Sequence, residues 1–261
     1  MKAIDYKEAH RNLVAALVAR SERHQAMRAA IGGEFDAVGK LEHHLLRSLG
    51  LSDGHLVVDV GCGSGRLSVQ LAPFPGIRYI GSDVVGPLLA YASEISRRPD
   101  WTFVCTDGTG IPCEDACADY VCFFSVFTHL LHEDTFRYFR ESARVLKPGG
   151  RLVFSFLEFR IACHWNIFSA TVEGSQPGQH ANQFVDRDAI REWAAHSGLE
   201  VAQLCDGDKP HIPIPEEVLW ENGARMESFG CLGQSVAVLK RPWPPNPQPS
   251  PARLTPPRQG A

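Results

Sequence analysis

The sequence has no long apolar run and no excess of basic residues. No stretch approaches the roughly 20 apolar residues that cross a membrane, and the first 20 residues do not follow the plan of a signal peptide. The 26 lysines and arginines face 30 aspartates and glutamates, for a net charge of −4. We therefore expect a cytoplasmic protein without a membrane or nucleic-acid partner, because nonspecific phosphate binding requires a basic surface.

Paired cysteine and histidine ligands at the spacing of a zinc site are also missing. The eight cysteines are scattered, and Cys113 and Cys117, four residues apart, have no companion pair. Cys105 and Cys122 fall within predicted buried strands, where reduced thiols serve as small apolar residues. The sequence therefore predicts no metal site.

Helices and strands can be predicted from the spacing of apolar residues. Apolar positions at helical spacing predict a helix over 5–30 and a second over 34–49. From residue 55 onward, short apolar strands alternate with amphipathic helices, which is typical of a parallel sheet covered on both faces. The predicted strands are 56–60, 77–82, 101–105, 119–124, 151–157, 199–204 and 234–240. The predicted helices between them are 65–71, 86–98, 132–146 and 186–198.

The remaining segments show no such periodicity. Residues 158–185 are predicted to be an irregular insertion, and the segment with Pro210, Pro213 and Pro215 a loop. The proline-rich tail 241–261 is predicted to be disordered. These boundaries divide the chain into N-terminal helices over 1–50, a domain over 51–240 and the tail.

The stretch VVDVGCGSG at 57–65 predicts a ligand site. A strand that ends in glycines and opens a helix presents free backbone N–H groups at the carboxyl edge of the sheet, where open α/β sheets bind ligands. A dinucleotide is one alternative, because Asp83 ends the next predicted strand. The dinucleotide pattern, however, requires glycine at position 66, which is Arg66 here. A glycine turn without any ligand is the other alternative.

With Asp83 ending YIGSD and Asp107 in CTDG, this stretch resembles the motifs of class I S-adenosylmethionine-dependent methyltransferases over about 55–158. FFSVFTHL (123–130) and FRYFRESARVLKPGGRLVFSF (136–156) resemble bacterial methyltransferases of the type-11 and type-12 kind. The resemblance implies an α/β, Rossmann-like, doubly wound seven-stranded sheet. This sheet would be mostly parallel, with an antiparallel last strand between the fifth and sixth. Residues 1–50 would form a helical lid over the cofactor.

The resemblance also implies the cofactor, S-adenosyl-L-methionine, and the residues that bind it. Asp59 and the glycine loop would face its amino-acid end, Asp83 its ribose hydroxyls, Val84 the adenine face and Asp107 the adenine amino group. The remaining cofactor-binding candidates are Gly61, Cys62, Gly63, Gly65, Gly108 and Ser125.

A hydroxyl acceptor must lose a proton on methylation, and His129, just after the fourth predicted strand, is the candidate catalytic base. The structural alternative is that His129 caps or packs the turn. Glu158, His164 and His180 are candidates for the acceptor pocket, with Trp165 and Phe168 as apolar walls or as packing of the insertion.

The expected function is metal-independent methyl transfer to a hydroxyl of a small-molecule or glycan acceptor. No motif specifies the acceptor's identity or the oligomeric state. Two alternatives are a nicotinamide-dependent (NAD(P)) oxidoreductase and a non-catalytic cofactor-binding subunit.

Overall fold

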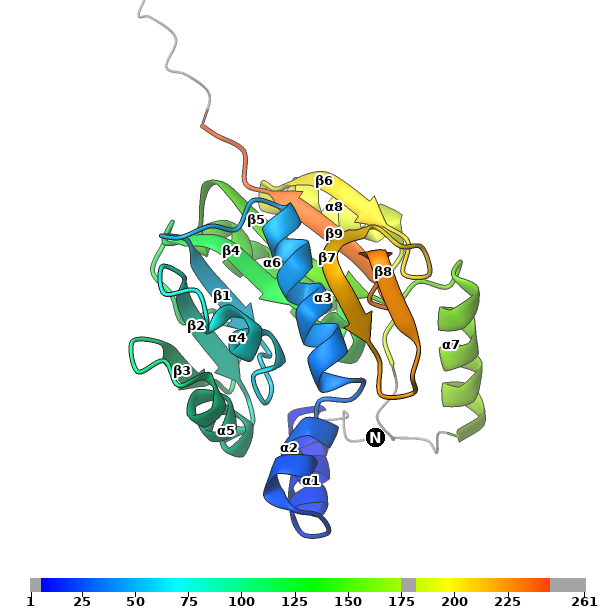
Figure 1. Ribbon diagram of the computed structural model, residues 1–261. Helices are drawn as coiled ribbons and strands as arrows, with labels where there is room; N and C mark the ends of the chain where they lie inside the picture. Colours follow the sequence, from blue (N-terminus) through cyan, green and yellow to red (C-terminus); the bar gives the residue numbers. More distant parts are fainter. Residues whose placement is uncertain (1–5, 175–181, 245–261) are drawn as a thin grey trace, which may run out of the picture.

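The computed structural model describes residues 6–174 and 182–244. A seven-stranded sheet forms its centre, in the order β3-β2-β1-β4-β5-β9-β6, with a separate two-stranded ribbon, β7-β8 (Figure 1). The sheet strands are β1 (Leu56–Val60), β2 (Arg78–Asp83), β3 (Thr102–Cys105), β4 (Ala118–Phe123), β5 (Leu146–Phe156), β6 (Glu200–Cys205) and β9 (Ser235–Lys240). The first five strands run parallel, and β9 lies antiparallel between β5 and β6. The predicted fold class is thus confirmed.

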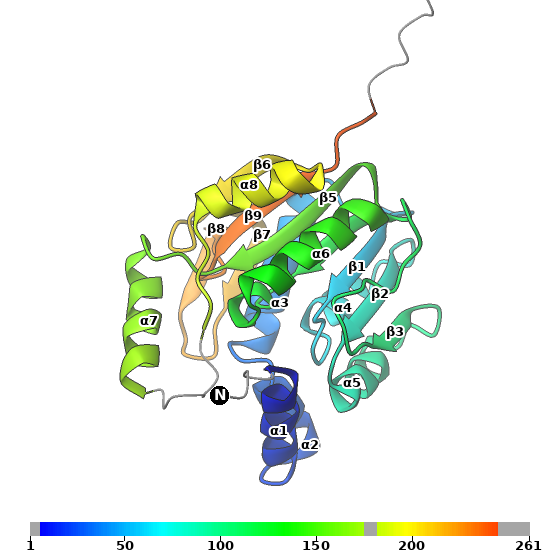
Figure 2. The same ribbon diagram turned by 180° about the vertical axis from the view of Figure 1, so that it is seen from behind.

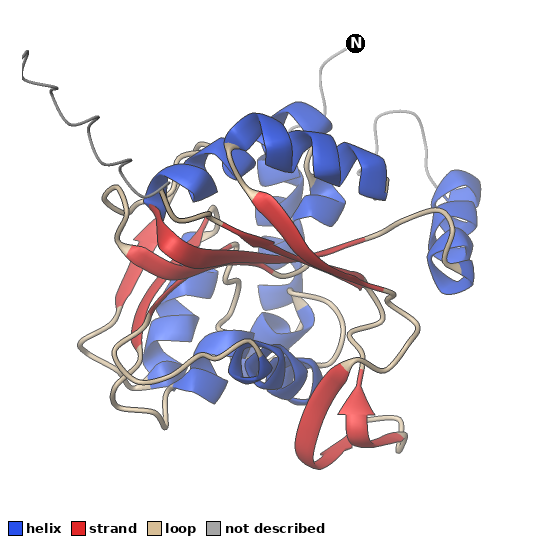
Figure 3. Ribbon diagram, turned by 90° about the horizontal axis from the view of Figure 1, so that it is seen from above, coloured by secondary structure: helices blue, strands red, loops and turns tan. Residues whose placement is uncertain are grey.

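Helices cover both faces of the sheet (Figure 3). The helices that follow the domain's strands are α4 (Arg66–Leu71), α5 (Gly86–Ser96), α6 (His132–Val145) and α8 (Arg187–Ser197). Successive residues of β1 supply the two cores: Val58 packs in the cluster with α6 and α8, and Val57 in the cluster with α3 (Phe35–Ser48) and α4. This alternation explains why β1 is apolar on both sides. Figure 2 shows α6 and α8 lying side by side.

The predicted single helix over 5–30 is wrong: the chain forms two helices, α1 (Tyr6–Val18) and α2 (Arg23–Ala29). The N–H groups of Arg20 and Ser21 both donate to the Leu17 carbonyl, which closes α1 with a turn. The turn folds α2 back so that Val14 and Met27 share one apolar cluster with Leu88 of α5. Burial of these residues therefore favours a hairpin over a continuous helix.

The prediction of an irregular insertion is also wrong in part, because α7 spans Ala162–Gly174. Its apolar residues lie all around the helix and, of its residues, only His164 is buried, so the helical period that would predict it is missing. In Figures 1 and 3, α7 stands apart from the layered sheet.

The segment predicted as a proline-rich loop forms β7 (Ile212–Leu219) and β8 (Arg225–Gly230). Ile212, Ile214 and Val218 of β7 pack in the α3 core. Proline lacks an N–H donor but is tolerated in a two-stranded ribbon, where each strand has an unpaired edge. The prolines therefore do not exclude strand here. Most of the tail predicted to be disordered, residues 245–261, lies outside the described residues.

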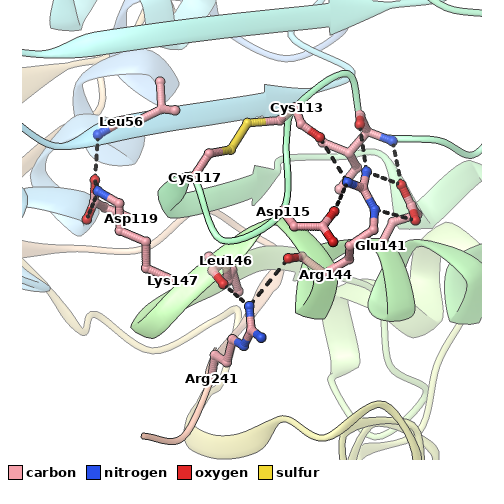
Figure 4. The surroundings of a disulfide bond; sticks show 11 residues. Leu56, Cys113, Asp115, Cys117, Asp119, Glu141, Arg144, Leu146, Lys147 and Arg241 are labelled. Carbon is pink, nitrogen blue, oxygen red and sulfur yellow. Dashed lines mark hydrogen bonds and ion pairs between the residues drawn. A yellow bond between two sulfur atoms is a disulfide. The ribbon is translucent and has the colours of Figure 1, made fainter.

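One disulfide, Cys113–Cys117, lies in the β3–β4 connection (Figure 4). Beside it, Arg144 of α6 donates hydrogen bonds to the Cys113 carbonyl and to Asp115. No pattern in the sequence indicated this bond. Cys122 is buried as predicted, but the prediction that Cys105 is buried is wrong: it is exposed, because β3 is an edge strand. Within 6–174 and 182–244, no helix is long and apolar enough to cross a membrane.

Candidate active site

A cavity of about 570 Å³ lies at the carboxyl ends of β1, β2 and β4. Its wall includes most of the predicted cofactor residues: Asp59, Gly61, Cys62, Gly63, Asp83, Val84 and Ser125. Gly65, which is not part of this wall, directly precedes α4. The sequence did not predict the contribution of Tyr6, His10 and Leu13 of α1 or of Glu42 of α3, all of which line the same cavity.

The glycine loop contacts other parts of the protein, so its glycines are required for packing as well as for binding a ligand. Gly61 has φ +73°, and a Cβ atom there would lie 2.4 Å from Cγ2 of Val126. Any other residue at position 61 would therefore collide with the segment that carries His129. The glycine allows β1 and the end of β4 to approach closely across the cavity.

Asp83 joins the end of β2 to the glycine loop. Its Oδ2 accepts a hydrogen bond from the Gly63 N–H and its Oδ1 one from the Val85 N–H, both at 2.9 Å. Burial raises the pKa of Asp83, although these backbone donors oppose the rise. Each carboxylate oxygen has a further lone pair, so the side chain can still accept bonds from a ligand.

Asp59 is buried at the base of the cavity. Its Oδ2 accepts a hydrogen bond from the Tyr79 hydroxyl at 2.7 Å. Burial raises its pKa to about 7, and the hydrogen bond from Tyr79 limits the rise. The carboxyl is thus poised between its neutral and charged forms near pH 7.

Ser125 turns the chain after β4. It has φ +58°, and its N–H donates to Ser155 Oγ at 2.8 Å. Gln234 of the loop before β9 donates from Nε2 to Ser125 Oγ and accepts at Oε1 from Ser155 Oγ. This hydrogen-bonded ring stabilises the turn in its left-handed conformation, and His129, four residues later, lines the cavity.

Thr106, directly after β3, lines the cavity, whereas Asp107 and Gly108 do not. Asp107 is exposed, and its carbonyl accepts a hydrogen bond from Lys7. The Gly108 carbonyl accepts one from the Tyr138 hydroxyl, and Tyr138 does line the cavity. The role of Asp107 toward adenine stays a prediction.

The residues predicted for the acceptor pocket lie elsewhere. Glu158 is buried and forms ion pairs with Arg160 and Arg187, and it also accepts a hydrogen bond from Ser235. Burial raises its pKa, but these donors outweigh the effect and hold the pKa below its usual value. His164 is fully buried and accepts at Nδ1 from the Glu158 N–H. Neither side chain lines the cavity.

His180 lies outside the described residues. Trp165 and Phe168 of α7 form an aromatic cluster with Phe159 and Phe184, with ring centroids 4.7–6.2 Å apart, and do not line the cavity. Within 6–174 and 182–244, no three His, Cys, Asp or Glu side chains form a group that could hold a metal ion.

A seven-stranded sheet with one antiparallel strand, whose cavity combines the glycine loop with Asp83, defines a Rossmann-like methyltransferase fold. The comparisons agree. A family model described as a methyltransferase domain matches residues 58–154. The methyltransferase GfsG of Streptomyces halstedii is 28% identical over 212 residues, which cover 80% of this chain and 74% of that protein. A malonyl-[acyl-carrier protein] O-methyltransferase of Hahella chejuensis is 30% identical over 148 residues, which cover 55% of this chain and 50% of that protein.

Among solved structures, magnesium protoporphyrin IX methyltransferase from Synechocystis PCC 6803 with bound SAH shares the fold. The TM-score is 0.60 at 18% identity, and the match covers 91% of this chain and 100% of that one. The methyltransferase-domain match and these relatives support a class I S-adenosylmethionine-dependent methyltransferase with S-adenosyl-L-methionine as its cofactor. This placement decides against the nicotinamide-dependent oxidoreductase.

Proposed function

We propose that the enzyme methylates a hydroxyl oxygen of a small-molecule acceptor without a metal, with His129 as the base. The observation that carries this proposal is that His129, the glycine loop and Asp83 line one cavity. A base and a cofactor site must share one cavity if proton removal and methyl transfer are to occur together. The Hahella relative is named as an O-methyltransferase, which is consistent with this reaction.

Each residue has a distinct role in this proposal. When bound, S-adenosylmethionine supplies a methyl on a positive sulfur, so that the new O–CH₃ bond forms as the S–CH₃ bond breaks and its electron pair stays on sulfur. His129 accepts the proton of the acceptor hydroxyl. Asp83 accepts hydrogen bonds from the ribose hydroxyls, the glycine loop faces the amino-acid end, and Asp107 accepts from the adenine amino group. Residues 1–50 act as the lid, since α1 supplies cavity wall.

The cavity wall favours an acceptor with an apolar body over a glycan. Apart from the groups assigned to the cofactor, its residues are mainly apolar, and such walls bind apolar ligands with few polar contacts. The apolar members beyond the glycine loop and its neighbours are Ala9, Leu13, Ala29, Ala30, Ile31, Leu67, Phe124, Val126 and Leu130.

The test uses methyl-labelled S-adenosylmethionine with a panel of phenols, aliphatic alcohols and oligosaccharides. We expect a mass gain of one methyl group on a hydroxyl of an apolar small molecule. His129→Ala should keep cofactor affinity and lower turnover, because the group that accepts the hydroxyl proton is lost. His132→Ala is the matched control, because His132 is exposed and does not line the cavity.

Four results would contradict the proposal or a part of it. Methylation only at nitrogen or carbon would exclude the hydroxyl acceptor. Methylation only of oligosaccharides would favour the glycan. Cofactor binding without methylation of any compound would favour the non-catalytic alternative. Unchanged turnover in His129→Ala with the true acceptor would remove this residue from the mechanism.

A further inference from the structure

Two oppositely charged side chains line the cavity beside the glycine loop and are not explained by the mechanism above. Glu42 of α3 has an exposed fraction of 2% and Arg66 of α4 one of 7%. They form an ion pair, with Glu42 Oε1 2.9 Å from Arg66 Nη2. Arg66 Nη1 also donates to the Gly32 carbonyl at 3.2 Å. Charged groups with so little exposure are rare unless they are fully paired.

The pairing is incomplete. Apart from the Glu42–Arg66 ion pair itself, Glu42 Oε1 and Arg66 Nε, both buried, have no hydrogen-bond partner among the described residues. An unsatisfied buried donor or acceptor costs about 1–3 kcal/mol, and more when it is charged. Because folded proteins seldom leave such groups unsatisfied, the two atoms point to a ligand.

The position of the pair is fixed by the packing of α3 on α4. A Cβ atom at Gly39, one turn before Glu42, would lie 2.6 Å from the Arg66 carbonyl oxygen. The absence of a side chain at position 39 lets the two helices approach closely. The fold therefore brings Glu42 next to the first residue of α4, at the end of the glycine loop.

The chemistry of the two unsatisfied atoms defines the ligand group. A carboxylate oxygen accepts from an ammonium, and a guanidinium N–H donates to a carboxylate. A group that carries both charges, the zwitterionic end of an α-amino acid, satisfies both at once. The nearby acid, Asp59, already accepts the Tyr79 hydroxyl and is the weaker candidate for the ammonium.

We propose that Glu42 and Arg66 recognise the amino-acid end of the cofactor, with Glu42 accepting from its ammonium and Arg66 donating to its carboxylate. This inference rests on the assigned cofactor, and it moves the main ammonium contact from the glycine motif to the helix before it. Glu42 and Arg66 are then determinants of specificity for the intact cofactor over adenosine thioethers that lack this end.

The test compares two ligands by calorimetry. S-Adenosylhomocysteine carries the amino-acid end, whereas 5′-methylthioadenosine has the same thioether and adenosine without it. Glu42→Gln should weaken S-adenosylhomocysteine by about tenfold or more, the scale for a hydrogen bond to a charged group. The affinity of Glu42→Gln for 5′-methylthioadenosine should stay within about twofold of that of the unaltered protein. This unchanged affinity would also show that the variant is folded. Glu192→Gln, on the exposed face of α8, is the matched control and should change neither affinity.

Arg66→Met is the second variant. It should bind S-adenosylmethionine and its decarboxylated form equally well, whereas the unaltered protein prefers the carboxylated form. If Glu42→Gln binds S-adenosylhomocysteine and 5′-methylthioadenosine equally more weakly, or loses affinity for neither, the proposal is overturned. The ion pair is then purely structural. If the unaltered protein binds neither thioether, the cofactor assignment itself fails. If it binds both without preference, only the role of Glu42 and Arg66 fails.

Discussion

Replacing Asp59 with asparagine tests whether the cavity keeps a carboxyl neutral at its base. Asp59 has an exposed fraction of 3%, and its pKa is raised from 3.8 to about 7, first by burial. A raised carboxyl pKa means that the folded state holds a proton that the unfolded chain has lost. The free energy of unfolding therefore falls as the pH rises from about 4 to about 7, because the folded protein must then accept a buried charge.

The size of the effect follows from the two pKa values. Between pH 5 and pH 8 the Asp59 carboxyl alone should lower the free energy of unfolding by about 2.5 kcal/mol. Glu42 and Asp83 line the same cavity and also have raised pKa values, so they contribute with the same sign, whereas the positive charge of Arg66 opposes the rise of the Asp59 pKa. The difference between the unaltered protein and Asp59→Asn isolates the contribution of Asp59.

The assay is urea unfolding of both proteins, without cofactor, at pH 5 and pH 8. The amide oxygen introduced by Asp59→Asn can still accept the Tyr79 hydroxyl, so the variant should keep this hydrogen bond. Its free energy of unfolding should change by about 2.5 kcal/mol less over this pH range than that of the unaltered protein. The same pH dependence in both proteins would show that Asp59 is ionised throughout. The account of its burial would then be wrong.

Two further predictions concern stability. Glu158→Gln should lower the free energy of unfolding by about 1.5–3 kcal/mol, because it removes the charged acceptor of Arg187 and Ser235, while Arg187 keeps its ion pair with Asp206. Cofactor affinity, measured by calorimetry, should not change. A loss of affinity would show that Glu158 contributes to cofactor binding. Replacing Cys113 and Cys117 together with serine should cost about 2 kcal/mol, the loop-closure entropy for so short a loop. Identical unfolding curves of the unaltered protein with and without a thiol reductant would contradict this contribution of the disulfide.

The central strands could be predicted because buried strands are almost continuously apolar, a pattern that is visible in the sequence. β1 is buried along its whole length, so both of its faces must be apolar, and the glycines after it mark the turn. The elements that were missed depend on distant contacts. α7 has no apolar stripe, and β7 is stabilised by packing against α3, which lies far earlier in the chain. Local patterns carry no information on such packing.

The same distinction applies to the site. That Asp83 lines the cavity could be predicted from one position, the carboxyl end of a parallel strand next to the glycine loop, whereas its role toward the cofactor stays a prediction. Glu42 gave no such signal, since an acid within an amphipathic helix is usually on the solvent side. Only the close approach of α3 to α4 turns it into the cavity.

Glu158 shows why the strand-end rule selects too many residues. It follows β5 as Asp83 ends β2, and the sequence alone treats the two carboxylates alike. What separates them is the charge that each one meets. Glu158 meets Arg187 of α8 and Ser235 of β9, and these donors occupy its oxygens. Asp83 accepts its hydrogen bonds from backbone N–H groups, so its remaining lone pairs can serve a ligand. A strand-end acid thus keeps lone pairs for a ligand only where no arginine of the protein occupies them first.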